Sequence, residues 1–195
     1  MLIFTFGAMN SGKSAYALMT LHQRHRPHAP AHRATALLAT TLDRSETTVT
    51  SRTGMTGPAL QLVPGEVTAA QFPPSDTVVI DEAQFLTPAD VEQLALLSNG
   101  GTEVICFGLR TDFTGHLFPG SKRLIELADA VHQLTLEPLC ATCDRIAVIN
   151  ARLVGEVLTT DGPQVALDSI DSRSPTEVSY APMCVRCWWR ASRRY

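Results

Sequence analysis

The fold follows from residues 2–14, LIFTFGAMNSGKS. Residues 2–6 are apolar and predict a short buried strand, and a loop bounded by Gly7 and Gly12 comes directly after them. From about residue 12 to residue 25 the pattern is helical. A strand, a glycine-bounded loop and a helix in immediate succession are typical of an α/β protein.

The loop matches the pattern G-x-x-x-x-G-K-[ST], which is typical of phosphate-binding loops. Glycines allow the backbone to curl so that its N–H groups point into one concavity, and the following helix directs its positive end at the anion. We expect Lys13 to reach the β- and γ-phosphates and Ser14 to offer its hydroxyl to Mg²⁺. The alternative is a purely structural glycine-rich turn. The candidate nucleotide-binding residues of the loop are Gly7, Ala8, Met9, Asn10, Ser11, Gly12, Lys13 and Ser14.

Apolar runs and helical patterns alternate through the first part of the chain. Further strands are predicted at 34–41, 77–80 and 103–108, and a helix at 121–130. Strands separated by helices indicate a mainly parallel sheet with flanking helices, here of the P-loop, RecA-like type. The polar segment 43–57 is predicted to be a loop.

A helix start is predicted at Thr87, because Thr87 can cap, Pro88 suits the first helical position and Asp90 favours the positive helix end. Val91, Leu94 and Leu97 then face one side of that helix.

Two acids, Asp81 and Glu82, follow the third apolar run. In P-loop proteins an acid at such a strand end helps to hold Mg²⁺, and Asp81 fits that role. Glu82 could accept a proton from an attacking hydroxyl or water. The alternative is a solvated strand end.

The character of the sequence changes near residue 138. We expect a nucleotide-binding α/β domain at 1–138 and a small β-rich, metal-binding module at 139–195. Residues 145–158 are rich in β-branched side chains, and 161–163 is predicted to be a turn. The stretch onward to residue 190 is expected to be poor in strands.

Two C-x-x-C pairs, separated by residues 144–183, lie in this second module. Two such pairs can place four thiolates tetrahedrally around Zn²⁺, and a site with all four positions filled is expected to be structural. The alternatives are two disulfides or idle thiols. The expected ligands are Cys140, Cys143, Cys184 and Cys187, whereas Cys106 lies within an apolar run and is expected to be a core residue.

Composition and charge exclude several classes of protein. The 195 residues are 45% hydrophobic and 18% charged, which is ordinary for a folded domain. A net charge of −3 gives no electrostatic case for binding to nucleic acid or to an acidic membrane surface. No apolar run approaches the length of a membrane span, and the start of the chain does not read as an export signal. We therefore expect a cytoplasmic protein with no nucleic-acid or membrane partner.

Together these motifs resemble the type II thymidine kinase family. GAMNSGKS is similar to the family's phosphate loop, DEAQF at 81–85 to its magnesium and base segment, and GLRTDF at 108–113 to its Gly-Leu-x-x-x-Phe segment. The two cysteine pairs resemble its zinc site, and Tyr180 lies where the family keeps a substrate-contacting tyrosine.

The resemblance implies transfer of the γ-phosphoryl of ATP to the 5′-hydroxyl of thymidine or deoxyuridine, with Glu82 as general base. It implies further nucleotide contacts from Asp81, Ala83, Gln84 and Arg44. It implies a loop between the cysteine pairs, the lasso, that closes over the base. It also implies a homotetramer and feedback inhibition by the product triphosphate. The implied substrate-binding residues are Met9, Asp43, Phe85, Leu109, Phe113, Phe118, Arg152 and Tyr180.

The chain departs from the family pattern in the lasso. Asp168-Ser169 follows the short apolar run 165–167, where the family often has two glycines, and 171–176 is an additional insert. Two other functions fit the motifs: a P-loop ATPase whose zinc module binds protein or DNA, and a non-catalytic nucleotide-binding protein. In the ATPase Glu82 would activate water.

Overall fold

The computed structural model describes residues 1–25, 36–41, 47–136, 138–162, 164 and 178–192. The chain forms two compact units that are discontinuous in sequence. The first comprises Met1–Phe6, Gly12–Arg110 and Phe118–Leu134, and the second comprises Gly7–Ser11, Thr111–Leu117 and Thr135–Tyr195. No helix within the described residues is long and apolar enough to cross a membrane.

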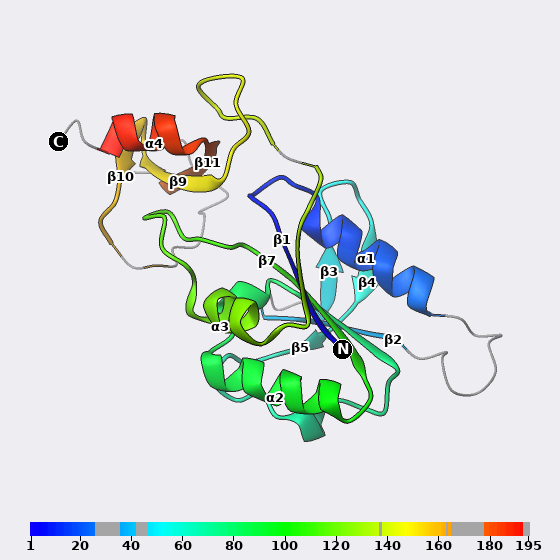
Figure 1. The fold of residues 1–195 in the computed structure, drawn as a ribbon. Helices are drawn as coiled ribbons and strands as arrows, with labels where there is room; N and C mark the ends of the chain where they lie inside the picture. The colour runs from blue at the N-terminus through cyan, green and yellow to red at the C-terminus, as the bar shows by residue number, and fades with distance from the viewer. Residues whose placement is uncertain (26–35, 42–46, 137, 163, 165–177, 193–195) are drawn as a thin grey trace. The chain divides into compact units, whose positions relative to one another are not determined.

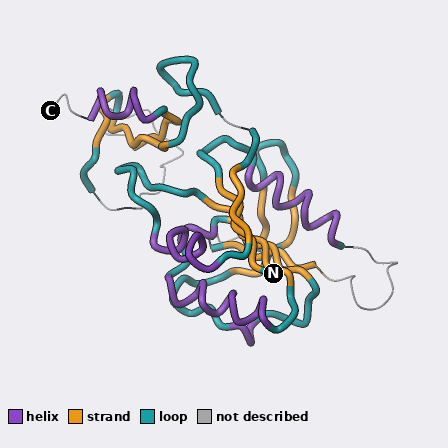
Figure 2. The backbone as a smooth tube through the Cα atoms, viewed as in Figure 1, coloured by secondary structure: helices purple, strands orange, loops and turns teal. Residues whose placement is uncertain are grey.

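The first unit is built on a six-stranded sheet (Figures 1 and 2). The strand order is β5-β2-β6-β7-β1-β8, and every pairing within it is parallel. The predicted mainly parallel sheet is thereby confirmed. The strands are β1 (Leu2–Phe6), β2 (Ala36–Thr40), β5 (Leu60–Gln61), β6 (Thr77–Asp81), β7 (Glu103–Gly108) and β8 (Ala130–Gln133).

Helices cover both faces of this sheet (Figure 1). α1 (Lys13–Arg24) packs on one face of the sheet through Ala17 and Leu18. Its partners there include Val79 and other strand side chains that point to that face. α2 (Pro88–Asn99) and α3 (Pro119–Leu127) pack on the opposite face, where Val78 and Ile80 point. Central strands that are buried on both faces explain the continuous apolar runs in the sequence.

The start of α2 agrees with the predicted capping pattern. Thr87 Oγ1 accepts a hydrogen bond from the Asp90 backbone N–H, and Asp90 Oδ2 accepts one from the Thr87 N–H at 2.8 Å. Asp90 also accepts from the N–H groups of Gly65 and Val67. The Asp90 side chain therefore caps the helix and anchors the loop before it. Two short 3₁₀ helices, η1 (Ala69–Gln71) and η2 (Ala83–Phe85), complete the connections around β6.

The prediction of a loop over 43–57 is wrong for its later part. β3 (Thr48–Thr50) and β4 (Thr56–Pro58) form an antiparallel hairpin. Gly57 suggested a break, but it lies in β4 and pairs with Val49, and a Cβ at this position would come within 2.7 Å of Leu18 Cδ2. Glycine thus allows the hairpin to pack closely on α1.

The predicted helix at 121–130 is displaced toward the N-terminus. α3 ends at Leu127, and the following residues form β8, an edge strand that the sequence did not indicate. Its residues are largely exposed, so hydrogen bonding to β1, not burial, maintains the strand. An edge strand of this kind carries little hydrophobic signal.

The second unit contains a three-stranded antiparallel sheet of order β10-β9-β11. Its strands are β9 (Ile149–Val154), β10 (Val157–Thr159) and β11 (Val178–Met183), and α4 (Val185–Ser192) follows. The β-rich reading of 145–158 agrees with β9 and β10. The expectation of few strands up to residue 190 is wrong at β11, because cross-strand pairing with β9 compensates for its weak pattern and for Pro182. α4 was not predicted.

Candidate active site and metal centre

In the first unit the candidate catalytic residues lie at one edge of the sheet. β6 ends at Asp81 and is followed by Glu82, β7 ends just before Leu109, and α1 begins at Lys13. Because the strands are parallel, their carboxyl ends share an edge, which is where ligands bind in open α/β sheets. The topology therefore brings together the lysine of the phosphate loop and the acid pair of β6.

Lys13 and Asp81 are both buried, and each interacts electrostatically with the other and with Glu82. Burial lowers the pKa of the Lys13 ammonium, and the negative charges of Glu82 and Asp81 oppose that change. Burial and the charge of Glu82 raise the pKa of Asp81 to about 6, against the opposing effects of a hydrogen bond from Ser14 and the Lys13 charge. The positive charge of Arg52 also acts on Lys13 and lowers its pKa further, so the site combines two acids with two basic groups.

The donor set fits Mg²⁺. Asp81 is 3% exposed, and its Oδ1 is buried without a hydrogen-bond partner among the described residues. A buried, unpartnered carboxylate oxygen is costly unless a cation binds it. The Ser14 hydroxyl, which bonds to the same carboxylate, is the second hard oxygen of the set.

Glu82 is held in an unusual conformation. Its φ of 57° and ψ of 34° place it in the left-handed region, where few non-glycine residues lie. The Thr41 hydroxyl donates to the Glu82 carbonyl at 2.6 Å, and the Gln84 side-chain amide donates to Glu82 Oε2 at 2.6 Å. The half-buried Glu82 side chain is therefore fixed from both its backbone and its carboxylate.

Residues 7–11 of the phosphate loop belong to the second unit. Asn10 has a φ of 67°, and Ser11 is buried with its Oγ unpartnered among the described residues. The Met9 backbone N–H donates to Asn150 Oδ1 at 2.8 Å, which ties the loop to β9. Gly12, at the start of α1, has a φ of 77°, a conformation that glycine adopts at little cost.

Three of the expected pocket residues lie in the first unit. The rings of Phe85 and Phe118 meet edge to face, with centroids 5.8 Å apart. Phe118 is buried, whereas Phe85 and Leu109 are half-buried. Ala83 and Gln84 are buried in η2.

The other expected pocket residues belong to the second unit. The Arg152 guanidinium carbon lies 3.6 Å from the Phe113 ring centroid, and Arg152 is only 3% exposed. Arg152 Nε and its terminal nitrogen donate to the Tyr180 hydroxyl at 3.1 and 2.9 Å. The structure thus brings Phe113, Arg152 and Tyr180 together, with Met9 half-buried in the same unit. Asp43, Arg44 and the lasso residues 165–177 lie outside the described residues.

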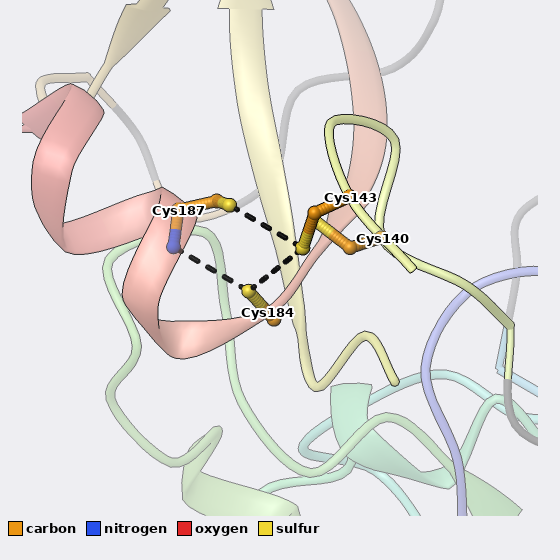
Figure 3. A group of neighbouring side chains, drawn as sticks. All are labelled: Cys140, Cys143, Cys184 and Cys187. Atoms are coloured by element: carbon orange, nitrogen blue, oxygen red, sulfur yellow. Dashed lines mark hydrogen bonds between the residues drawn. The ribbon is translucent and has the colours of Figure 1, made fainter. Parts of the chain in front are cut away.

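The four predicted cysteine ligands converge (Figure 3). Their sulfur atoms all lie within 4.8 Å of one another, and Cys143 Sγ is 3.7 Å from Cys184 Sγ and 3.6 Å from Cys187 Sγ. Four thiolates bound to one Zn²⁺ at 2.3 Å in a tetrahedron would be about 3.8 Å apart. All five cysteines are free thiols, so disulfides do not account for the cluster, and Cys106 lies fully buried in the core as predicted.

Several residues of the site were not indicated by the sequence. Thr41 and Asn150 position Glu82 and Met9, as described above. Gln164 Nε2 donates to Asp112 Oδ2 at 2.9 Å, and Trp188 Nε1 donates to the Phe113 carbonyl at 3.0 Å. Asn150, a polar residue inside an apolar run, carried the only available signal.

A parallel sheet, a phosphate loop, an acid pair at a strand end and a four-cysteine cluster define a P-loop protein with a metal-binding module. The thymidine kinase family model matches residues 1–188, and the chain belongs to that family.

Similar proteins come from several bacteria. A thymidine kinase of Streptomyces coelicolor is 38% identical over 95% of this chain and 87% of its own length. Those of Chromobacterium violaceum and Streptococcus thermophilus are 34% and 31% identical, over 96% and 98% of this chain and 97% and 95% of their own lengths.

Proposed function

We propose that this kinase transfers the γ-phosphoryl group of ATP to the 5′-hydroxyl of thymidine, and of deoxyuridine, in nucleotide salvage. Family membership and the names of its relatives support the substrate and the donor. The observation that carries the mechanism is the grouping of Lys13, Asp81 and Glu82 at the carboxyl edge of the first sheet. Phosphoryl transfer depends mostly on positioning and charge, which such a group supplies.

Each residue has a distinct role in the proposed reaction. The Glu82 carboxylate accepts the proton of the 5′-hydroxyl while the hydroxyl oxygen bonds to the γ-phosphorus. The bond between the γ-phosphorus and the β,γ-bridging oxygen breaks, and ADP leaves. The Lys13 ammonium stabilises negative charge on the phosphates, and the N–H groups of residues 7–12 bind them. Asp81 and Ser14 would hold Mg²⁺, which neutralises phosphate charge when bound. Ala83 and Arg44 are proposed as further nucleotide contacts, and Gln84 as one through its backbone alone, since both polar atoms of its side chain are bonded to Glu82 and Leu109.

The nucleoside is proposed to bind against Met9, Phe85, Leu109, Phe113, Phe118 and Tyr180. Apolar and aromatic surface with a few polar groups suits a pyrimidine. Asp43 and Arg152 are proposed as polar substrate contacts. The product triphosphate is proposed to inhibit the enzyme by feedback.

The four cysteines are proposed to hold a structural Zn²⁺ that stabilises the second unit, because a site with four protein ligands leaves no open position for a substrate. We further propose two domains with a boundary near residue 138, a homotetramer, a cytoplasmic location and no nucleic-acid partner.

The test is to incubate the purified protein with ATP, Mg²⁺ and thymidine and to quantify thymidine monophosphate and ADP. Equal amounts of both products are expected. Glu82→Gln should lower kcat by about 100-fold or more while ATP binding persists. Glu66→Gln, which changes an exposed acid outside the site, is the matched control and should keep wild-type kcat. ATP hydrolysis stimulated by DNA with no phosphorylated nucleoside would refute the proposal.

A further inference from the structure

Gln84 is buried at the centre of the acid-bearing segment. It is 1% exposed, and both polar atoms of its side chain make hydrogen bonds within the first unit. Its Nε2 donates to Glu82 Oε2 at 2.6 Å, and its Oε1 accepts from the Leu109 backbone N–H at 2.9 Å. Gln84 thus connects the Glu82 carboxylate to the backbone at the end of β7, and this connection restricts the movement of the carboxylate.

The orientation of the amide is determined by its partners. A backbone N–H can only donate, so the atom that faces Leu109 must be the amide oxygen. The amide nitrogen therefore faces Glu82, where an ionised carboxylate can only accept. The chain thus specifies that the amide nitrogen of the side chain, and not its oxygen, meets Glu82.

The surroundings of Gln84 leave it little freedom. A Cβ at residue 108 would lie 2.8 Å from Gln84 Oε1, so Gly108 provides the space that the side chain occupies. The Leu109 carbonyl accepts a hydrogen bond from the buried Ser121 hydroxyl at 2.6 Å, which holds Leu109 in place. A Cβ at Gly120 would come within 2.4 Å of the Leu86 carbonyl, so α3 packs directly on the backbone of η2.

We propose that Gln84 is a positioning residue that orients the Glu82 carboxylate through Oε2 and reserves Oε1 for the proton of the acceptor hydroxyl. This inference rests on the proposed function, in which Glu82 is the general base. Glu82 has its backbone held by Thr41 and one carboxylate oxygen held by Gln84. A base fixed at two points stays aligned with the attacking hydroxyl, which contributes to kcat and not to substrate binding.

Two substitutions separate this role from a structural one. Gln84→Met keeps the length of the side chain but removes both hydrogen bonds. Gln84→Glu keeps an acceptor for the Leu109 N–H but removes the amide donor to Glu82. Both variants should lower kcat for thymidine by about 10- to 100-fold, with KM for ATP and thymidine changed less than about threefold. If Gln84 only supports Leu109, Gln84→Glu will keep the wild-type kcat, and the inference is overturned.

A double-mutant cycle with Glu82→Gln tests the coupling. Gln84→Met should lower kcat in the wild-type background but leave the residual kcat of Glu82→Gln unchanged, because no base then needs orientation. An equal loss in both backgrounds would overturn the inference. A wild-type protein that transfers no phosphoryl group to thymidine would overturn the proposed function as well. An active wild type with unaffected Gln84 variants would overturn only the role of Gln84.

Discussion

The guanidinium of Arg152 lies over the ring of Phe113, with its central carbon 3.6 Å from the ring centroid, and it donates two hydrogen bonds to the hydroxyl of Tyr180. An arginine that is 3% exposed must place its charge and its N–H groups on partners within the protein. Phe113 and Tyr180 supply the aromatic face and the acceptor. Three residues that are far apart in the sequence thus form one buried cluster in the second unit.

Tyr180→Phe removes the hydroxyl that accepts both of these bonds. The Arg152 N–H groups then lose the Tyr180 acceptor, although one terminal nitrogen still donates to the Gln164 carbonyl at 3.4 Å, so the free energy of unfolding should fall by about 1–2 kcal/mol. Urea unfolding followed by circular dichroism measures the change. Tyr16→Phe, at a tyrosine that is 51% exposed on α1, is the matched control and should change stability by less than about 0.5 kcal/mol. Equal losses in the two variants would contradict the role assigned to the cluster.

Asp90→Ala should lower the stability of the first unit by more than the loss of an ordinary helix cap would. Its carboxylate accepts from the N–H groups of Gly65, Val67 and Thr87, all of which would lose an acceptor. We expect a loss of about 2–4 kcal/mol in the free energy of unfolding, measured by chemical denaturation. Thr87→Ala leaves these backbone bonds to Asp90 in place and should cost only about 1 kcal/mol. A larger cost for Thr87→Ala would show that the cap itself, not the anchored loop, dominates.

Removal of one thiolate should abolish metal binding. The wild type is expected to purify with about one zinc ion per chain, as measured by elemental analysis. Cys187→Ser should contain much less zinc and should unfold at a lower temperature. Cys106→Ala removes a core thiol that does not belong to the four-cysteine cluster, and this variant should keep its zinc. Equal zinc contents in wild type and Cys187→Ser would contradict a four-cysteine site.

Asn150→Ala should weaken ATP binding indirectly, although Asn150 itself is not proposed to contact the nucleotide. The Asn150 side chain accepts from the Met9 N–H and so restrains the phosphate loop. Loss of one such bond should raise the Kd for ATP about three- to tenfold, measured by isothermal titration calorimetry. Asn99→Ala, at the exposed end of α2, should leave the Kd unchanged. An unaltered Kd in Asn150→Ala would show that the loop keeps its shape without this bond.

Local sequence was sufficient wherever a signal depends on nearby residues. The strand–loop–helix of residues 2–24, the capped start of α2 and the two-sided apolar strands β6 and β7 all agree with their predictions. Contiguous motifs also identified the phosphate loop, the acid pair and the cysteine pairs. These features depend on backbone propensity, burial and short-range spacing, which are readable along the chain.

Elements whose stability depends on distant partners were missed. The hairpin β3–β4 packs on α1, β8 depends on pairing with β1, and β11 depends on pairing with β9. In the active site, Thr41 and Gln84 meet Glu82 only because β2, β6 and η2 converge at one edge of the sheet.

The amino-acid sequence by itself determined the α/β class, the candidate phosphate loop, the paired acids and the four cysteines that cluster. Only the tertiary structure decided that Glu82 adopts a left-handed conformation, that Gln84 directs its amide at that acid, and that Arg152 is buried against Phe113. The physical reason is that hydrogen-bond geometry and burial depend on which strand ends and side chains meet in space, and that information is distributed over the whole chain.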